Sequence, residues 1–386
     1  MGVTAARGFR AAGVAAGIKA GGRLDLALVV NDGPLDAAAG AFTRNKVKAA
    51  PVLWSRQVLT SGRLRAVVLN SGGANACTGP EGFADTHATA EHVARTLNVG
   101  AIDVAVCSTG LIGERLPMPA VLTGIEKSAA ALAATPAAGQ AAAEAVMTTD
   151  TVPKQAAVRH SDGWTVGGLA KGAGMLAPSL ATMLVVLTTD AAADAATLDT
   201  SLRRATRTTF DRLDVDGACS TNDTVLLLSS GAAQRTPRQV DLDQAVHAVC
   251  AELARQLQAD AEGVTKRISI TVGGARSEDD AVAVARAVAR DSLVKTALFG
   301  SDPNWGRIVA AAGMADADLD PDRLDVTING VTLCRNGYAA ADRSAADLSG
   351  PEVTVHIGLN LDAGSATIRT TDLSHGYVEE NSAYSS

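Results

Sequence analysis

Short apolar runs that end in glycine- or hydroxyl-rich turns recur along this chain and constrain its fold more than any other feature. Two of them, residues 64–79 and 102–113, flank an alanine-rich segment of helical period at 84–97. Helical patterns then alternate with strand-like runs through the rest of the sequence. This alternation predicts an α/β (α+β) fold of mixed sheets and helices.

The remaining elements are predicted from the same periodicities. Helical patterns cover 118–147, 196–209, 240–259 and 279–290. Strand-like runs lie at 182–189, 220–231 (STNDTVLLLSSG), 267–274 (RISITVGG), 294–300 (VKTALFG), 323–330 (RLDVTING), 353–359 (VTVHIGL) and 365–372 (SATIRTTD). The stretch around Pro153 and the glycine-rich stretch before Thr182 are the two predicted seams between parts of the chain.

Composition limits the kinds of molecule that this chain is expected to bind. The chain has 386 residues, a formal net charge of −7 and only 3% aromatic residues, which argues against a nucleic-acid surface and favours a small-molecule ligand. No apolar run reaches the length of a membrane span, and charges interrupt the N-terminal segment, so we expect a cytoplasmic protein with no membrane partner. Scattered cysteines and histidines without metal-ligand spacing predict neither a disulfide framework nor a metal site.

Three fragments of familiar motifs are too incomplete to assign a site. GAGMLA at 172–177 has the glycine spacing of a dinucleotide loop, but Pro178 and a strand follow where a helix should begin. GGLAKG at 167–172 lacks the Ser/Thr that follows the lysine of a P-loop. SLVK, from Ser292 to Lys295, has the S-x-x-K spacing of serine acyl-enzymes without the companion motifs of that class.

The junction between Ala181 and Thr182 is the strongest candidate for chemistry. A glycine-rich segment broken by Pro178 precedes it, and an apolar strand-like run follows. A threonine at a chain N-terminus can use its own α-amine, with a pKa of roughly 8, as the general base for its hydroxyl. An internal threonine reaches that state if its hydroxyl attacks the preceding carbonyl. The alternative is that Thr182 is an ordinary β-branched strand residue.

Motifs along nearly the whole chain resemble those of the ornithine acetyltransferase family, which also provides glutamate N-acetyltransferase activity in arginine biosynthesis. The processing segment KGAGMLAPSLATML at 171–184 carries the resemblance together with GAFTRNKVKAAPV at 40–52, LNSGGANACTG at 69–79, STGLIGERLP at 108–117, MTTDTVPK at 147–154, DGACSTNDTVLLL at 216–228, DAEGVTK at 260–266, DPNWGR at 302–307 and DLSHGYVEENSAYSS at 372–386. So many matches in one order are far more specific than any single motif. Three positions depart from the usual text of the family: Ser179, Leu180 and the terminal Ser386.

The resemblance implies a self-processing enzyme of two interlocked lobes, with an N-terminal threonine nucleophile and no metal or bound cofactor. Cleavage between Ala181 and Thr182 would leave an α chain (1–181) and a β chain (182–386), assembled as an α2β2 heterotetramer. Thr182 would take acetyl from N2-acetyl-L-ornithine, release L-ornithine and pass the acetyl group to L-glutamate, giving N-acetyl-L-glutamate. By similarity, the oxyanion hole is Thr109 and Gly110, and the substrate is held by Thr182 with Thr148, Thr149, Lys171, Glu262, Asn381 and Ser386.

Other interpretations stay open at the level of sequence. Acetyl-CoA is a second possible acetyl donor, and a related N-acetyl amino acid of secondary metabolism is a second possible substrate. An amidohydrolase would pass the acyl group to water, and a binding protein would keep Thr182 within an intact chain. A second strand entry with Thr221, Asn222 and Asp223 resembles that of Thr182, which suggests that it supports the site from behind.

Overall fold

The computed structural model describes residues 2–176 and 183–383. The chain folds into two compact units, one formed by Met1–Asp211 and Ala218–Leu257, the other by Arg212–Gly217 and Gln258–Ser385. Neither predicted seam, near Pro153 or before Thr182, is a boundary between these units. Within the described ranges, no helix combines the length and the apolar character that a membrane crossing requires.

The first sheet of the larger unit has the strand order β1-β2-β4-β5. Its neighbours run antiparallel except β4 and β5, which are parallel and confirm the two predicted strand-then-turn segments. The strands are β1 (Phe9–Val14), β2 (Leu26–Asn31), β4 (Ala66–Ser71) and β5 (Val104–Thr109).

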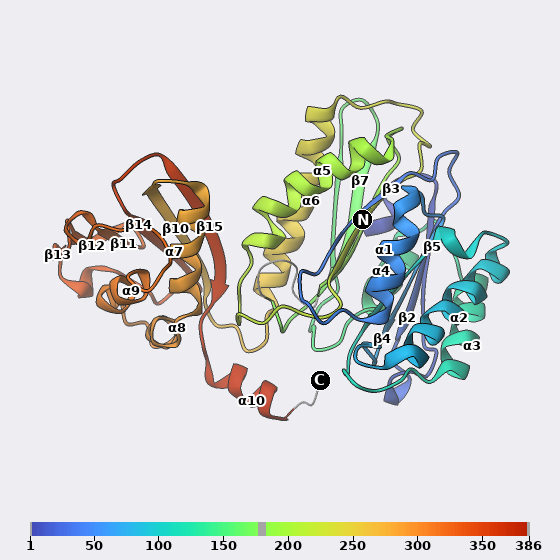
Figure 1. The fold of residues 1–386 in the computed structure, drawn as a ribbon, viewed down its shortest axis with the longest axis horizontal. Helices are drawn as coiled ribbons and strands as arrows, with labels where there is room; N and C mark the ends of the chain where they lie inside the picture. The colour runs from blue at the N-terminus through green and yellow to red at the C-terminus, as the bar shows by residue number, and fades with distance from the viewer. Residues whose placement is uncertain (1, 177–182, 384–386) are drawn as a thin grey trace. The chain divides into compact units, whose positions relative to one another are not determined.

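Helices cover this sheet, and Figure 1 shows α2 and α3 side by side against it. Trp54 and Ser55 of α1 donate side-chain hydrogen bonds to the β5 carbonyls of Val104 and Val106, at 3.0 and 2.7 Å. The predicted helix at 118–147 is two helices, because Thr135 caps a second one that starts at Pro136. The helices are α1 (Ala50–Val58), α2 (Gly79–Leu97), α3 (Met118–Ala130) and α4 (Pro136–Ala145).

The second sheet has the order β3-β9-β8-β7-β6. Strands β7 and β8, which lie before and after the predicted cleavage site, are antiparallel neighbours with Lys171 opposite Leu184. The two strand entries that resemble each other belong to the parallel neighbours β8 and β9. The strands are β3 (Ala38–Phe42), β6 (Lys154–Arg159), β7 (Thr165–Lys171), β8 (Leu184–Thr189) and β9 (Thr224–Ser229).

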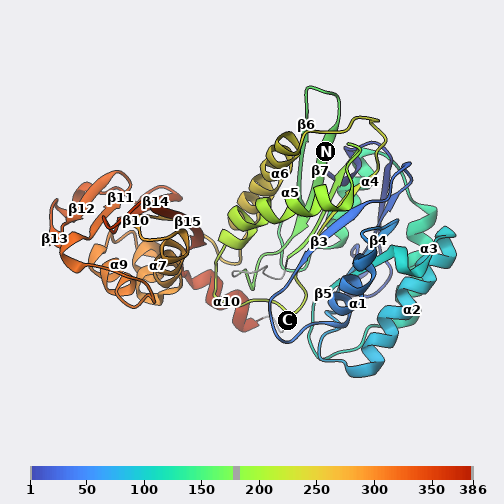
Figure 2. The ribbon, with the colours of Figure 1, turned by 45° about the horizontal axis from the view of Figure 1, so that its top comes forward.

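The main core of the larger unit lies between these two sheets. Leu184 and Val186 of β8 share one buried apolar cluster with Val67 and Leu69 of β4. Alternate residues of a strand point to opposite faces, so β8 also presents side chains to the other face of its sheet. There Figures 1 and 2 both show α5 (Ala195–Thr208) together with α6 (Gln239–Ala259).

The smaller unit is built on one mixed sheet of order β13-β12-β11-β14-β10-β15, with α7 packed on β10 and β15 (Figure 2). The predicted strand at 294–300 is wrong, because these residues belong to helix α8. Asp291 caps that helix by accepting a hydrogen bond from Val294 N–H at 2.8 Å. The elements are β10 (Arg267–Ala275), β11 (Asp325–Ile328), β12 (Val331–Arg335), β13 (Tyr338–Ala339), β14 (Glu352–Gly358), β15 (Gly364–Thr371), α7 (Glu278–Arg290), α8 (Ser292–Phe299), α9 (Trp305–Ala312) and α10 (His375–Ala383).

Candidate active site

Lys171 is the centre of a buried polar cluster in the larger unit. It is the last residue of β7, and its side chain is only 2% exposed. Its ammonium donates to Thr109 Oγ1 at 3.2 Å and to Thr148 Oγ1 at 2.9 Å. The fold therefore brings together three of the predicted site residues from the ends of β5 and β7 and the segment after α4. Thr149, the neighbouring candidate, is half-buried.

Asp150 supplies the negative charge of this cluster. Its Oδ1 accepts from Lys154 Nζ at 2.6 Å and from Gly172 N–H at 2.7 Å, and its Oδ2 lies 4.0 Å from Lys171 Nζ. Burial by itself would raise the pKa of Asp150, but the two lysine charges and these hydrogen bonds outweigh it and lower the pKa to about 2. Sequence reasoning missed Asp150, although it directly follows the two candidate threonines.

The turn after β5 requires glycine at position 110. Gly110 has φ 131°, and a Cβ there would lie 2.5 Å from Gly73 N and 2.6 Å from Gly72 C. Thr109, at the end of the strand, accepts Gly73 N–H on its carbonyl at 3.0 Å. Because Thr109 Oγ1 accepts from Lys171, its hydroxyl proton can be donated to another oxygen.

A buried amide and a buried hydroxyl fix the two turns that surround Gly110. Asn222 Nδ2 donates to Ala74 O at 2.6 Å and to Ser108 O at 2.8 Å. Ser108 Oγ donates to Asn70 Oδ1 at 2.6 Å. The entry of β9 is thereby bonded to the ends of β4 and β5. Ser108 and Asn70 carried no sequence signal of this role beyond their place in turn motifs.

Asp223 holds the backbone of Met183, the residue next to Thr182. Its Oδ1 accepts Met183 N–H at 3.1 Å, and Thr224 N–H donates to Met183 O at 3.0 Å. Full burial, with a further contribution from the neighbouring Cys219, raises the pKa of Asp223 well above its usual range. The contact joins the second strand entry to the residue after Thr182, and its support of the site stays a prediction. Ala181 and Thr182 lie outside the described residues.

Two further predicted residues meet in the smaller unit. Asn381 Nδ2, on α10, donates to Glu262 Oε2 at 3.0 Å and to Tyr377 O at 3.0 Å. Gly263 (φ 60°) allows this approach, because a Cβ there would lie 2.0 Å from Tyr377 N. Ser386, the last predicted substrate residue, lies outside the described residues.

One cluster in the described ranges has the composition of a metal site. Ligand atoms of His160, Asp162 and Asp241 lie within 4.8 Å of one another. However, Arg238 pairs with both oxygens of Asp241 at 2.7 Å, and Asp162 N–H donates to His160 Nδ1 at 3.2 Å. Because Arg238 already pairs with Asp241 and His160 Nδ1 accepts a backbone N–H, we assign no metal to this cluster.

The fold and the site define a mixed α/β protein that buries a lysine, an aspartate and threonine hydroxyls where strands of two sheets end. The sequence profile of the ArgJ family matches residues 10–386, and the chain belongs to this family. The resemblance found from the sequence motifs is thereby confirmed at the level of the family.

Two relatives match over the full length of this chain, and one crystallised chain matches a part of it. The arginine biosynthesis bifunctional protein ArgJ of Mycolicibacterium paratuberculosis is 67% identical, covering 100% of this chain and 97% of the relative. The protein of the same name from Streptomyces avermitilis is 60% identical, covering 100% of both. A crystallised chain of ornithine acetyltransferase from Mycobacterium tuberculosis, complexed with ornithine, is 69% identical over 46% of this chain and 94% of that chain, with a TM-score of 0.46.

Proposed function

We propose that this protein transfers acetyl from N2-acetyl-L-ornithine to L-glutamate in arginine biosynthesis, through an acetyl ester on Thr182. The observation that carries the proposal is the cluster in which the buried Lys171 bonds the buried Thr109 and the half-buried Thr148. Membership of the ArgJ family and relatives named for arginine biosynthesis support the pathway. The tight turn at Gly110 and the hydrogen-bonded backbone of Met183 support acyl transfer at this site.

The nucleophile would be prepared by self-cleavage. Thr182 Oγ attacks the carbonyl carbon of Ala181, the new C–O bond replaces the C–N bond, and the freed nitrogen takes up the hydroxyl proton. Water then hydrolyses the ester, which releases the Ala181 carboxylate and restores the Thr182 hydroxyl, and the α-amine freed in the first step serves as the base. Cleavage would leave the α chain (1–181) and the β chain (182–386) joined through the β7–β8 ladder. Two such pairs would form the α2β2 assembly.

Acetyl transfer passes through two tetrahedral intermediates, each with an oxyanion. We assign the oxyanion hole to the Thr109 hydroxyl and the Gly110 N–H. Losing one donor of an oxyanion hole typically costs about 2.7–4 kcal/mol of transition-state stabilisation. The ammonium of Lys171, 3.2 Å from Thr109 Oγ1, adds positive charge where the oxyanion forms. Asp150 lies 4.0 Å from the Lys171 ammonium and does not fully neutralise it, because Lys154 also pairs with this aspartate.

The substrates share an α-amino-acid core. We assign the contact from the MTTDT motif to Thr148, because it bonds Lys171, with Thr149 beside it. Glu262 would pair with the ammonium of L-ornithine, and Asn381 orients the Glu262 carboxylate. Ser386 would complete the set, with N-acetyl-L-glutamate leaving as the final product.

A second activity is favoured by the name of the full-length relatives, which are called bifunctional. We assign to it the transfer of acetyl from acetyl-CoA to L-glutamate at the same threonine. The acetyl ester of Thr182 is a common intermediate for both donors. The two activities should therefore be lost together in Thr182→Ala.

The decisive experiment is the intact mass of the purified wild-type chain and of Thr182→Ala, with Ser179→Ala as the matched control in the same segment. We expect two fragments that meet between Ala181 and Thr182 in the wild type and the control, and an intact Thr182→Ala chain. The wild-type β chain should gain one acetyl group on brief exposure to N2-acetyl-L-ornithine. Acetate release without L-glutamate would instead favour an amidohydrolase, and cleavage of Thr182→Ala would refute the nucleophile.

A further inference from the structure

Lys19 lies on the loop between β1 and β2, and a buried carboxyl group fixes this loop. Asp25, whose side chain is fully buried, accepts the backbone N–H groups of the four consecutive residues 16–19 at 2.6, 3.1, 2.7 and 2.9 Å. The backbone carbonyl of Asp25 also accepts Ser71 N–H at 2.9 Å, at the end of β4. The backbone of Lys19 is therefore held in place by the first sheet.

The side chain of Lys19 borders the candidate active site. A Cβ on Gly72 would lie 3.0 Å from Lys19 Cγ, and Gly72 packs against the turn at Gly110. Lys19 Nζ donates to Met147 O at 3.0 Å, directly before Thr148. The half-buried Lys19 therefore extends from the turn beside Gly110 to the segment that carries Thr148.

The ammonium of Lys19 keeps donors for a ligand. An ammonium has three N–H donors. Among the residues that the structure describes, Met147 O is the one hydrogen-bond acceptor of Lys19 Nζ, and no carboxylate forms an ion pair with it. The carboxylates of Asp25 and Asp150 act on it at longer range, and both accept hydrogen bonds from other groups.

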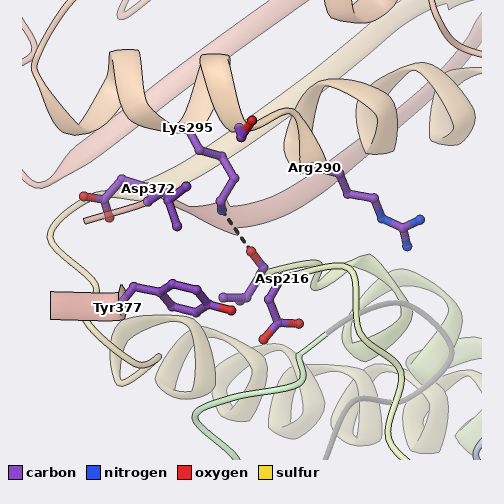
Figure 3. A pocket seen from close by; sticks show the side chains of 8 residues that line it. Asp216, Arg290, Lys295, Asp372 and Tyr377 are labelled. Atoms are coloured by element: carbon purple, nitrogen blue, oxygen red, sulfur yellow. Dashed lines mark hydrogen bonds between the residues drawn. The ribbon is translucent and has the colours of Figure 1, made fainter. Parts of the chain in front are cut away.

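Lys295 in the smaller unit shows the opposite arrangement. Its ammonium, in the pocket drawn in Figure 3, donates to Val215 O at 2.9 Å, to Thr370 Oγ1 at 3.1 Å and to Thr371 O. Three acceptors from the protein thus occupy the three donors of Lys295. A buried lysine with this set of partners serves the fold, whereas Lys19 has one such acceptor.

The surroundings of Lys19 do not fully stabilise its positive charge. Burial lowers the pKa of Lys19, and the charges of Arg23 and Lys171 lower it further. The carboxylates of Asp25 and Asp150 oppose this shift without cancelling it. A carboxylate that a ligand brings next to this ammonium would therefore be bound favourably.

Lys171 and Lys19 are suited to two different negative charges of the reaction. Lys171 already donates to Thr109 and Thr148, so its charge acts on the oxyanion. The α-carboxylate of each amino-acid substrate is attached to the same carbon as the reacting nitrogen, so it lies beside the oxyanion. We propose that Lys19 is a specificity-determining residue whose ammonium binds this α-carboxylate. The inference rests on the proposed acetyl transfer and adds a residue to that site.

Two acetyl donors test this role: N2-acetyl-L-ornithine and its α-carboxamide, which lacks the negative charge. In the wild type, kcat/KM should be lower for the carboxamide by at least about tenfold. Lys19→Met should lose about this factor for the carboxylate donor alone, and Lys19→Arg should retain part of the preference. Lys127→Met makes the same change at an exposed lysine of α3 and should keep the wild-type preference.

The ratio of the two donors separates substrate binding from a structural role. An equal loss for both donors in Lys19→Met would mean that Lys19 only holds the carbonyl of Met147, and it would overturn the proposal. Equal kcat/KM of the wild type for both donors would also overturn it. If Lys19→Met fails to fold, Lys19→Gln removes the charge but keeps a donor for Met147 O, and the same ratio decides.

Failure of the proposed function gives a different result. In that case the wild type transfers acetyl from neither donor, and isothermal titration of the same two compounds tests Lys19 by binding alone. A carboxylate preference in the wild type that Lys19→Met lacks would support the role of Lys19. Equal dissociation constants for the two compounds in the wild type would overturn it.

Discussion

Asp223 accepts the backbone N–H of Met183 on its Oδ1 at 3.1 Å, so a fully buried carboxyl group fixes the residue that follows Thr182. Thr224 N–H fixes the carbonyl of the same residue at 3.0 Å. Both backbone groups of Met183 are therefore held by the start of β9. A nucleophile attached to this backbone inherits its orientation, which matters because small misplacements of reacting atoms cost large factors in rate.

The first prediction tests whether Asp223 acts as a hydrogen-bond acceptor or through a negative charge. Because the pKa of Asp223 is raised well above its usual range, Asp223→Asn should keep cleavage and acetyl transfer close to the wild type. Asp223→Ala leaves Met183 N–H without its acceptor and should lower the free energy of unfolding by about 1–3 kcal/mol. Urea unfolding in the Thr182→Ala background, where we expect each chain to stay whole, measures the stability. Intact mass of the variants with Thr182 present measures the cleavage rate. Wild-type behaviour of Asp223→Ala would contradict this role.

The second prediction concerns Gly110. In Gly110→Ala the new Cβ meets the backbone of Gly73 and Gly72 in addition to the strain of φ 131°, so acetyl transfer should fall sharply. Gly113→Ala is the matched control, because its φ of 90° is also strained but no heavy atom lies within 4 Å of its Cβ. Acetyl-transfer rates and urea unfolding of both variants measure the difference. Equal effects in the two variants would mean that only backbone strain matters.

The third prediction separates two lysines that share Asp150. Lys154 Nζ lies 2.6 Å from Asp150, whereas Lys171 Nζ lies 4.0 Å away and bonds the site threonines. Lys154→Met should therefore cost more stability, about 3–5 kcal/mol for a broken buried pair. Lys171→Met should cost less stability and more acetyl-transfer activity. Unfolding free energies and kcat of the two variants should show this crossed pattern; parallel losses in both measurements would refute it.

The fourth prediction concerns the contribution of Asp150 to stability at acid pH. Its pKa falls from an ordinary 3.8 to about 2 in the folded chain. A carboxyl group with a depressed folded pKa stabilises the fold above its unfolded pKa, and that contribution is lost as the pH falls from about 4 to about 2. The difference in unfolding free energy between the wild type and Asp150→Asn should therefore shrink over this interval. A difference that is constant with pH would show that Asp150 is not a stabilising anion.

The fifth prediction concerns Lys295, whose pKa falls from an ordinary 10.5 to about 8 by burial. Between these values the unfolded chain binds the extra proton, so stability rises with pH. Relative to Lys295→Met, the wild type should gain unfolding free energy as the pH rises from about 8 to about 10.5. Urea unfolding of both proteins across this range tests it, and a flat or falling difference would argue against a buried, destabilised ammonium.

Much of the secondary structure was predictable, because the spacing of apolar residues along the sequence is a local property of the chain. The strand-then-turn segments became β4 and β5, and the helical patterns became α2, α5, α6 and α7. Residues 294–300 were predicted wrongly because a short apolar run fits a strand or a buried helix equally well. The Asp291 cap and the distant acceptors of Lys295, at Val215 and Thr371, decide for the helix.

Sequence by itself determined the family of this protein, its strand and helix pattern and the candidate residues, because motifs and periods are carried by neighbouring positions. Only the tertiary structure decided which of them meet. Lys171 reaches Thr109 across 62 positions because β5 and β7 end at one place, and Asp223 reaches Met183 across 40 because β8 and β9 are parallel neighbours. The charge on Asp150 likewise depends on its sequence neighbour Lys154 and on Lys171, which strand order brings to it, and no local pattern encodes that order.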